Sequence, residues 1–293
     1  MTKRNNPASI QLESKMIKHY IAYFSPAGTT RKVAERVQQA LQSHQIEVVM
    51  ADLSVHGGTL ASVLKDAAGP FVLWLGSPVY CDHALPPVME QIAALPDSLR
   101  GYSVPFVTWG GVCSGFALSE IGHALAAKHL SPLAAAKIMA EHSSTWDASQ
   151  PWEAGRPHEQ DLTLVDNLVE QVLQLLQGEN PQILDLAKLN YLSKAQQADV
   201  ALKSLDKAKV AMGTPKADEA LCVQCGECVQ ICPTGAMSLN PMPQVEAELC
   251  VVCHQCVRVC PEQAFPHNGD QAAQRIAGMA AASDEEKVSA VFY

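Results

Sequence analysis

The chain has 293 residues, which suggests two domains at roughly 150 residues each. Apolar residues make up 48% of the sequence and charged residues 17%, which excludes a disordered or collagen-like chain. The net charge is −9, and because an acidic chain repels the phosphates of nucleic acids and anionic membranes, we expect no nucleic-acid partner.

The N-terminal segment MTKRNNPASIQLESK lacks the apolar core of a signal peptide, so the sequence predicts a cytoplasmic protein. No stretch resembles a membrane span. The uncharged run at residues 101–118 is interrupted by Pro105 and four glycines, whereas a span needs about 20 mostly apolar residues.

From residue 18 onwards, short apolar runs alternate with amphipathic stretches. The apolar runs predict strands at residues 19–25, 46–53, 71–78, 104–109 and 134–140. Helical spacing predicts helices at residues 30–43, 60–68, 87–95, 117–128 and 162–176. Strands that are apolar on both faces and separated by helices are typical of a parallel sheet covered on both sides. Residues 18–180 are therefore expected to form an α/β domain with a doubly wound, five-stranded parallel sheet, which binds ligands beyond the carboxyl ends of its strands.

The loop after the first predicted strand, SPAGTT at residues 25–30, is rich in hydroxyl groups and leads directly into a helix. A helix N-terminus offers unpaired N–H groups and the positive end of the helix dipole, so it suits a phosphate, and Ser25, Thr29 and Thr30 add hydroxyl donors. The loop lacks the Gly-Lys-Ser/Thr ending of a nucleoside-triphosphate P-loop, and the chain contains no G-x-G-x-x-G. The alternative is an ordinary N-cap at Thr29 or Thr30.

Two more loops follow the third and fourth predicted strands, GSPVYCDHALPP at residues 76–87 and WGGVCSG at residues 109–115. They lie where a flat ring would sit beside the phosphate. With YFSPAGTT, this ordered set resembles the flavodoxin family, which implies a flavodoxin-like fold and bound FMN. Ala27 departs from the family's hydroxyl-x-Thr-Gly-x-Thr pattern, and a flavodoxin-like domain without flavin is the alternative. The residues that the resemblance assigns to FMN are Ser25, Pro26, Ala27, Gly28, Thr29, Thr30, Ser77, Pro78, Val79, Tyr80, Trp109, Gly110, Gly111 and Val112.

Eight of the ten cysteines lie between residues 222 and 260. CVQCGECVQICP recurs as CVVCHQCVRVCP 28 residues later, and each copy has the spacing C-x2-C-x2-C-x3-C-P. In this bacterial ferredoxin run three thiolates bind one [4Fe–4S] cluster and the fourth binds the other. The first cluster would be held by Cys222, Cys225, Cys228 and Cys260, and the second by Cys250, Cys253, Cys256 and Cys232.

Two zinc sites are the competing interpretation, because zinc also binds paired C-x2-C motifs. Zinc requires neither a third Cys at i+6 nor a fourth followed by Pro. Residues 217–268 resemble the two-cluster ferredoxins, which implies a small α+β domain.

The segments around this domain are less distinctive. Residues 181–216 are expected to form a connector, helical from 183 to 211, and the Ala-rich tail at residues 269–293 is expected to be helical. The order of the parts, with AEHSSTW and AGRPHEQDL between residues 140 and 162, resembles the EFR1-type ferredoxins. In that group a flavodoxin-like domain precedes a two-cluster ferredoxin domain, which implies electron transfer and names no substrate.

The expected function is electron transfer between one- and two-electron carriers, through FMN and two low-potential clusters. Over residues 217–270, seven acidic residues stand against Arg258 alone, which predicts low potentials and a redox partner protein with a basic docking face. The alternative is a flavin-dependent reductase of a small molecule, fed by the clusters. A redox sensor is a third interpretation, without a DNA-binding element to support it, and the sequence leaves a homodimer open.

Four further residues each allow two interpretations. Cys81 and Cys113 either place a thiol beside the flavin or are small buried apolar side chains. His142 either contacts flavin or substrate or is a plain loop histidine, and Trp109 either covers the ring or fills the sheet end. His254 is not expected to bind a cluster, since cysteines supply all eight thiolates.

Overall fold

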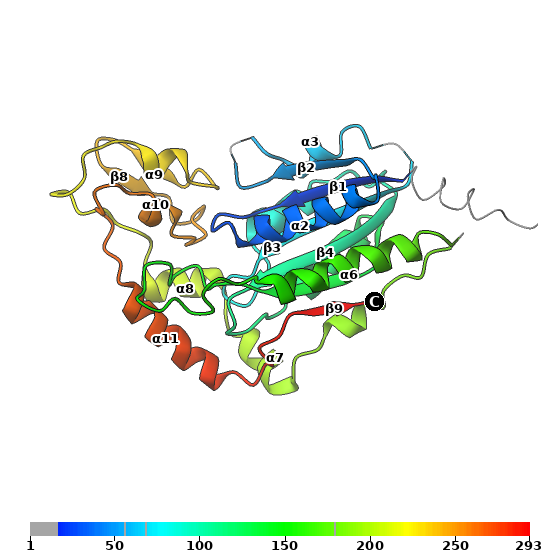
Figure 1. The fold of residues 1–293 in the computed structure, drawn as a ribbon. Helices are drawn as coiled ribbons and strands as arrows, with labels where there is room; N and C mark the ends of the chain where they lie inside the picture. Colours follow the sequence, from blue (N-terminus) through cyan, green and yellow to red (C-terminus); the bar gives the residue numbers. More distant parts are fainter. Residues whose placement is uncertain (1–16, 56, 68, 179) are drawn as a thin grey trace, which may run out of the picture.

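The computed structural model describes residues 17–293 except residues 56, 68 and 179. Residues 1–16, where the sequence predicts no signal peptide, lie outside the described residues, as does residue 68, the expected end of one helix. A twisted sheet between helices occupies the first part of the chain, and a smaller unit lies beside one end of it (Figure 1).

Five parallel strands form the main part of the sheet, in the order β2-β1-β3-β4-β6. This is the doubly wound order of flavodoxin-like folds, so the predicted fold class is confirmed. β3 is buried over its whole length, as expected of a strand with helices on both faces. The strands are β1 (Lys18–Tyr23), β2 (Val48–Asp52), β3 (Phe71–Pro78), β4 (Gly101–Trp109) and β6 (Ala135–Met139).

Two short strands extend the described sheet beyond the five that were predicted. β5 (Leu130–Pro132) pairs with the start of β4, and β9 (Ala290–Phe292) pairs antiparallel with β6. β9 corrects the prediction of a helical tail, since α11 (Gly269–Ala282) ends well before the C-terminus. Val291 and Phe292 pack on opposite faces of the sheet, and the strand covers an edge that β6 would otherwise expose.

Helices cover the two faces of the sheet in two separate groups. Each helix packs on the sheet through apolar side chains at helical spacing. In α2 (Thr29–Ser43) these include Val33, Val37 and Leu41, which are buried. One face carries α2 and α6 (Glu159–Leu175), and the other carries α3 (Leu60–Val63), α4 (Pro86–Ala93) and α5 (Ala117–Ala127). α3 is shorter than the helix predicted at residues 60–68.

The connector corrects another prediction, because residues 183–211 form three short elements instead of one helix. These are η1 (Leu186–Leu189), α7 (Lys194–Val200) and α8 (Leu205–Met212). The side chains of Asp185, Ser193 and Ser204 each accept a backbone N–H and so start a new helix. Leu184 and Leu189 are buried against the sheet, so the connector packs on the first part of the chain.

The second part of the chain is small. Each cysteine run contains one helical turn, α9 (Glu227–Gln230) or α10 (Gln255–Arg258), and a hairpin of β7 (Met237–Leu239) and β8 (Pro243–Val245) lies between them. α11 then leads back from this unit towards the sheet (Figure 1). None of the helices in the described residues is long and apolar enough to cross a membrane.

Candidate cofactor sites

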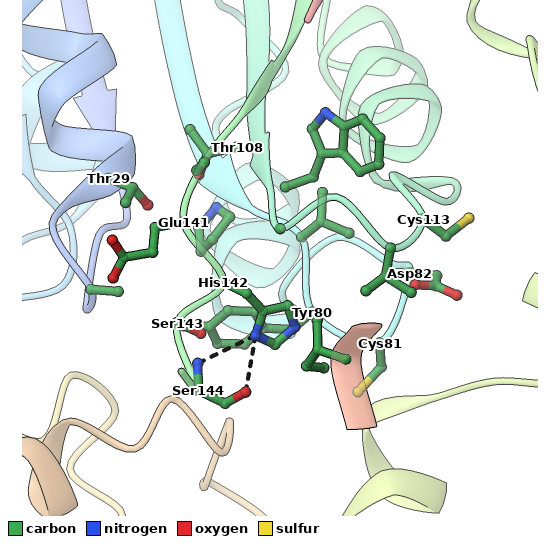
Figure 2. A pocket seen from close by; sticks show the side chains of 18 of the residues that line it. Thr29, Tyr80, Cys81, Asp82, Thr108, Cys113, Glu141, His142, Ser143 and Ser144 are labelled. Carbon is green, nitrogen blue, oxygen red and sulfur yellow. Dashed lines mark hydrogen bonds between the residues drawn. The ribbon is translucent and has the colours of Figure 1, made fainter. Parts of the chain in front are cut away.

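A cavity of about 190 Å³ opens at the carboxyl ends of the parallel strands (Figure 2). All three predicted flavin loops contribute to it, and we refer to it as the edge cavity. The residues expected to contact FMN that line it are Ala27, Thr29, Pro78, Val79, Tyr80, Trp109, Gly110 and Val112. The others, Ser25, Pro26, Gly28, Thr30, Ser77 and Gly111, are not among its lining residues.

Two of the predicted phosphate hydroxyls already have partners within the protein. The Ser25 hydroxyl accepts the backbone N–H of Arg31 at 2.9 Å and so caps the first turn of α2. The Thr30 hydroxyl lies 2.7 Å from that of Thr108, buried at the end of β4. Ser25 thus caps the first turn of α2, and Thr30 ties the start of α2 to β4. The alternative of an N-cap at Thr29 or Thr30 is wrong, because the N-cap is Gly28.

The N-terminus of α2 nevertheless offers an anion site. Gly28 is the N-cap, in the left-handed conformation at φ 88°, and a Cβ built there meets no atom within 4 Å. The N–H groups of Thr29 and Thr30 fall in the first turn, where helical N–H groups have no intrahelical acceptor. Thr29 also lines the edge cavity, so two backbone donors and one hydroxyl remain for a ligand.

The two ring loops carry buried polar aromatic groups. Burial raises the pKa of the Tyr80 hydroxyl, so Tyr80 stays protonated. The indole N–H of Trp109 is buried and has no hydrogen-bond partner in the described part of the chain. A buried donor of this kind is uncommon. Because this nitrogen has no surface exposed towards the edge cavity, it is not itself a donor to a ligand there. Trp109 is 1% exposed at the sheet end, which is the packing role, and it also lines the edge cavity, where a role over the flavin ring stays a prediction.

His142 lies in the loop after β6, inside the edge cavity (Figure 2). The Ser144 hydroxyl lies 2.9 Å from its Nδ1, and the Ser144 backbone N–H donates to the same atom at 3.3 Å. Because Nδ1 is therefore an acceptor, the neutral ring carries its proton on Nε2. Burial lowers the pKa of His142 to about 4, with the positive charge of Arg275 adding to this effect. His142 is thus a neutral hydrogen-bond donor at this cavity.

Gly110 allows this placement of His142. A Cβ on Gly110 would lie 2.6 Å from Cδ2 of the imidazole ring and 3.0 Å from its Cβ. Any side chain at position 110 would therefore displace the histidine. The two loops fit together only with glycine at this position.

Cys81 and Cys113 also line the edge cavity. Burial raises the pKa of both thiols, that of Cys113 to about 12. Protonated thiols are poor nucleophiles, which favours the interpretation of both as small apolar side chains.

Sequence reasoning missed the far wall of the edge cavity. It consists of Met212 from α8, Val252 and His254 from the second cysteine run, and Arg275, Ile276 and Met279 from α11. Ile276 and Met279 have helical spacing, which indicates an amphipathic helix but does not reveal which surface it covers. Only the tertiary packing brings these residues to the sheet edge.

The eight clustered cysteines line two small cavities. Cys222, Cys225, Cys228 and Cys260 surround one, the first site, and Cys232, Cys250, Cys253 and Cys256 surround the other, the second site. Each site combines three cysteines of one run with the last cysteine of the other, which is the crossing typical of two-cluster ferredoxins. The linings also include apolar side chains such as Phe265 and Val245, and a few polar ones such as Glu262 and His254. Four thiols around one cavity fit an iron–sulfur cluster.

One known protein family matches the part of the chain that carries the eight clustered cysteines. Residues 221–264 match the family described as "4Fe-4S dicluster domain". No curated protein sequence matches the chain.

Several solved structures are similar to the chain. A flavodoxin from the domain Archaea has a TM-score of 0.42 and 17% identity, over 55% of this chain and 100% of that one. Flavodoxin 2 from Bacillus cereus has a TM-score of 0.41 and 18% identity, over 54% of this chain and 98% of that one. Rubredoxin oxygen:oxidoreductase from Desulfovibrio gigas has a TM-score of 0.41 and 14% identity, over 55% of this chain and only 36% of that one.

Proposed function

We propose that the protein is an iron–sulfur flavoprotein that transfers electrons between one- and two-electron carriers. Residues 18–180 would bind FMN in the edge cavity, and residues 217–268 would hold one [4Fe–4S] cluster in each cysteine site. When bound, FMN exchanges one or two electrons and each cluster exchanges one. The observation that carries the proposal is that the edge cavity and the second site share a wall, since His254 lines both.

The chain's own residues would divide the work of binding FMN. The N-terminus of α2 with Thr29 would hold the phosphate, while Ser25 and Thr30 fix that loop. Tyr80, Trp109 and the backbone after β4 would surround the ring. His142 would donate a hydrogen bond from Nε2 to a ring atom. Backbone donors replace the hydroxyl that is missing at Ala27.

A flavin-dependent reductase is the second candidate, favoured by the cover on the edge cavity. α11 places Arg275, Ile276 and Met279 over it, whereas a simple flavin carrier exposes the ring edge to partners. In a reductase, His142 would donate a hydrogen bond to a small substrate instead of to the flavin.

The test is the iron, sulfide and FMN content of protein purified without oxygen. We expect about eight irons and eight sulfides per chain, as for two [4Fe–4S] clusters, together with one FMN. In Gly110→Ala the displaced His142 should cause loss of FMN while the iron content stays unchanged. Gly278→Ala is the matched control, because a Cβ there meets no atom within 4 Å.

Two results would contradict the proposal. Full iron without FMN in the unaltered protein would leave a ferredoxin joined to an empty flavodoxin-like domain and would also exclude the reductase. Zinc in place of iron would exclude electron transfer through the cysteine sites, and with it the proposed function.

A further inference from the structure

The two cysteine sites have different positions relative to the edge cavity. Val252 and His254 of the second run line this cavity, and His254 also lines the second site. Val251 is 3% exposed and packs in the core beneath the sheet, in contact with the first part of the chain. No described residue that lines the first site also lines the edge cavity. The second site is thus the inner one.

The first site faces solvent. Cys225 is exposed, and apolar Leu221 and Val223 beside it are 50% and 60% exposed. Exposed carboxylates lie in the same region: Glu227 and Glu262 line the first site with Val223, and Asp218 and Glu219 shortly precede Leu221 in the chain. An apolar centre with an acidic rim is complementary to a carrier protein whose docking face is apolar with a basic rim.

One loop makes several of the contacts that position the second site. We call residues 140–148 the joint loop and residues 217–268 the cluster unit. The joint loop lines the edge cavity with Glu141–Ser144 and contacts the cluster unit with Trp146. The Trp146 ring stacks on His267 at 4.2 Å between centroids and 8° between planes, and the Arg258 guanidinium lies 4.9 Å from the Trp146 centroid. Trp146 is therefore packed between two side chains of the cluster unit.

Backbone carbonyls of the joint loop fix the same two side chains. Arg258 donates to the Ser143 carbonyl at 3.2 Å, and His267 donates through Nε2 to the Ser144 carbonyl at 3.1 Å. Ser144 is also the residue that orients His142. The loop thus ties the position of the second site to the geometry of the edge cavity.

We propose that the sites act in a fixed order, in which the second site is adjacent to FMN, the first site exchanges electrons with a basic one-electron carrier protein, and Trp146 is the positioning residue that maintains this order. The inference rests on the proposed function. A reduced carrier that docks at the first site is oxidised by one electron for each electron that enters the chain. Two such encounters supply the two electrons of a full flavin reduction, with protons taken from solvent.

The first experiment tests the joint loop in the full-length holoprotein. Trp146→Ala removes the ring between Arg258 and His267, and Trp146→Phe keeps an aromatic ring there. After partial reduction, the microwave power that saturates the paramagnetic signal of the flavin reports how close a reduced cluster lies. We expect the signal of Trp146→Ala to saturate at several-fold lower power, with unchanged iron and FMN content, and that of Trp146→Phe to resemble the unaltered protein. Equal saturation in all three proteins would overturn the positioning role.

The second experiment tests the docking site with cytochrome c, a basic one-electron acceptor protein. Glu262→Gln removes a carboxylate that lines the first site, and Glu47→Gln makes the same charge change on the flavodoxin-like part, where Glu47 is exposed. At low salt we expect Glu262→Gln to slow cytochrome c reduction roughly threefold, and Glu47→Gln to leave it unchanged. Equal effects of the two substitutions would overturn docking at the first site.

Cofactor analysis of the same preparations distinguishes a failure of the proposed function from a failure of the proposed order of the sites. If FMN is absent, the proposed function fails, whereas the cytochrome c comparison still tests the first site. If all cofactors are present and the variants behave alike, only the order fails.

Discussion

At the scale of single residues, His19 shows what burial does to a titratable group. Its side chain lies on β1, is 1% exposed, and accepts the indole N–H of Trp74 on Nδ1 at 3.1 Å. Burial lowers the pKa of His19 to about 4. The folded state therefore keeps the ring neutral, while the unfolded chain takes up a proton below about pH 6.5. The stabilisation is complete above pH 6.5 and is lost as the pH falls towards 4.

This histidine gives a pH-dependence prediction. His19→Gln keeps an acceptor for Trp74 but does not titrate. Between pH 8 and pH 5 the unaltered protein should lose about 2 kcal/mol more stability than this variant. Urea unfolding followed by tryptophan fluorescence measures the difference, with His123→Gln, at an exposed histidine, as the control. Parallel stability curves for the unaltered protein and His19→Gln would contradict the predicted pKa.

The residues of the candidate sites were predictable to different degrees. Cysteine spacing alone groups the eight thiols, because the geometry of the cluster demands that spacing. The tautomer of His142 is set by Ser144, a neighbour whose hydroxyl direction no pattern reveals. The cover from α11 depends on a helix far along the chain. The sequence therefore predicts residues whose role follows from their spacing along the chain. It does not predict residues that reach the site only through tertiary packing.

At the scale of elements, the same distinction separates correct from incorrect predictions. The parallel strands and α2, α5 and α6 carry strong local periodicity, so their positions along the chain followed from the sequence. β9 did not, because an Ala-rich tail with Val291 and Phe292 at its end becomes a strand only where β6 offers a free edge. The connector broke into short helices at Ser193 and Ser204, where caps override the regular leucine spacing.

The segment between α11 and β9 is held by a buried ion pair, which yields a stability prediction. Lys137 on β6 and Glu285 lie 2.5 Å apart, with side chains only 6% and 4% exposed. Glu285 also accepts the backbone N–H of Ser114 at 2.7 Å, in the loop after β4. Glu285→Ala leaves the buried lysine charge without its carboxylate, beside the Trp109 and Tyr191 rings alone, and we expect a loss of about 3 kcal/mol.

Two further variants make this prediction specific. The double variant Lys137→Met/Glu285→Leu should recover most of the lost stability, because an apolar pair replaces the two charges. Glu286→Ala, at an exposed neighbouring residue, should change stability little. Denaturant midpoints compare all four proteins. If Glu285→Ala unfolds like Glu286→Ala, the ion pair does not hold the tail.

At the scale of the whole molecule, the carboxyl edge of the sheet is where all parts of the chain meet. The edge cavity takes its walls from the flavodoxin-like part, from the second cysteine run, from α8 and from α11. The doubly wound topology alone explains why the loops after β1, β3, β4 and β6 gather there. The joint loop and α11 then hold the cluster unit at that edge.

The two parts differ in how they are stabilised. The flavodoxin-like part has an extensive core on each face of its sheet, whereas the core of the cluster unit consists of Ala217, Cys228, Met237, Ala264 and Phe265. A unit of roughly 50 residues with so small a core is marginal without cross-links or metal. The clusters are therefore expected to supply the folding free energy of residues 217–268.

Removal of the clusters by oxidation and chelation should separate the two parts. Residues 217–268 should lose protection from amide hydrogen exchange, because their four-cysteine sites no longer hold the chain together. The joint loop should lose protection with them, since Trp146 stacks on the cluster unit. The strands β1, β3 and β4 should keep their protection, because their core does not depend on the clusters. Hydrogen exchange measured by mass spectrometry follows all these segments at once. Retained protection of residues 217–268 after complete loss of iron would show that the apolar core alone folds this unit.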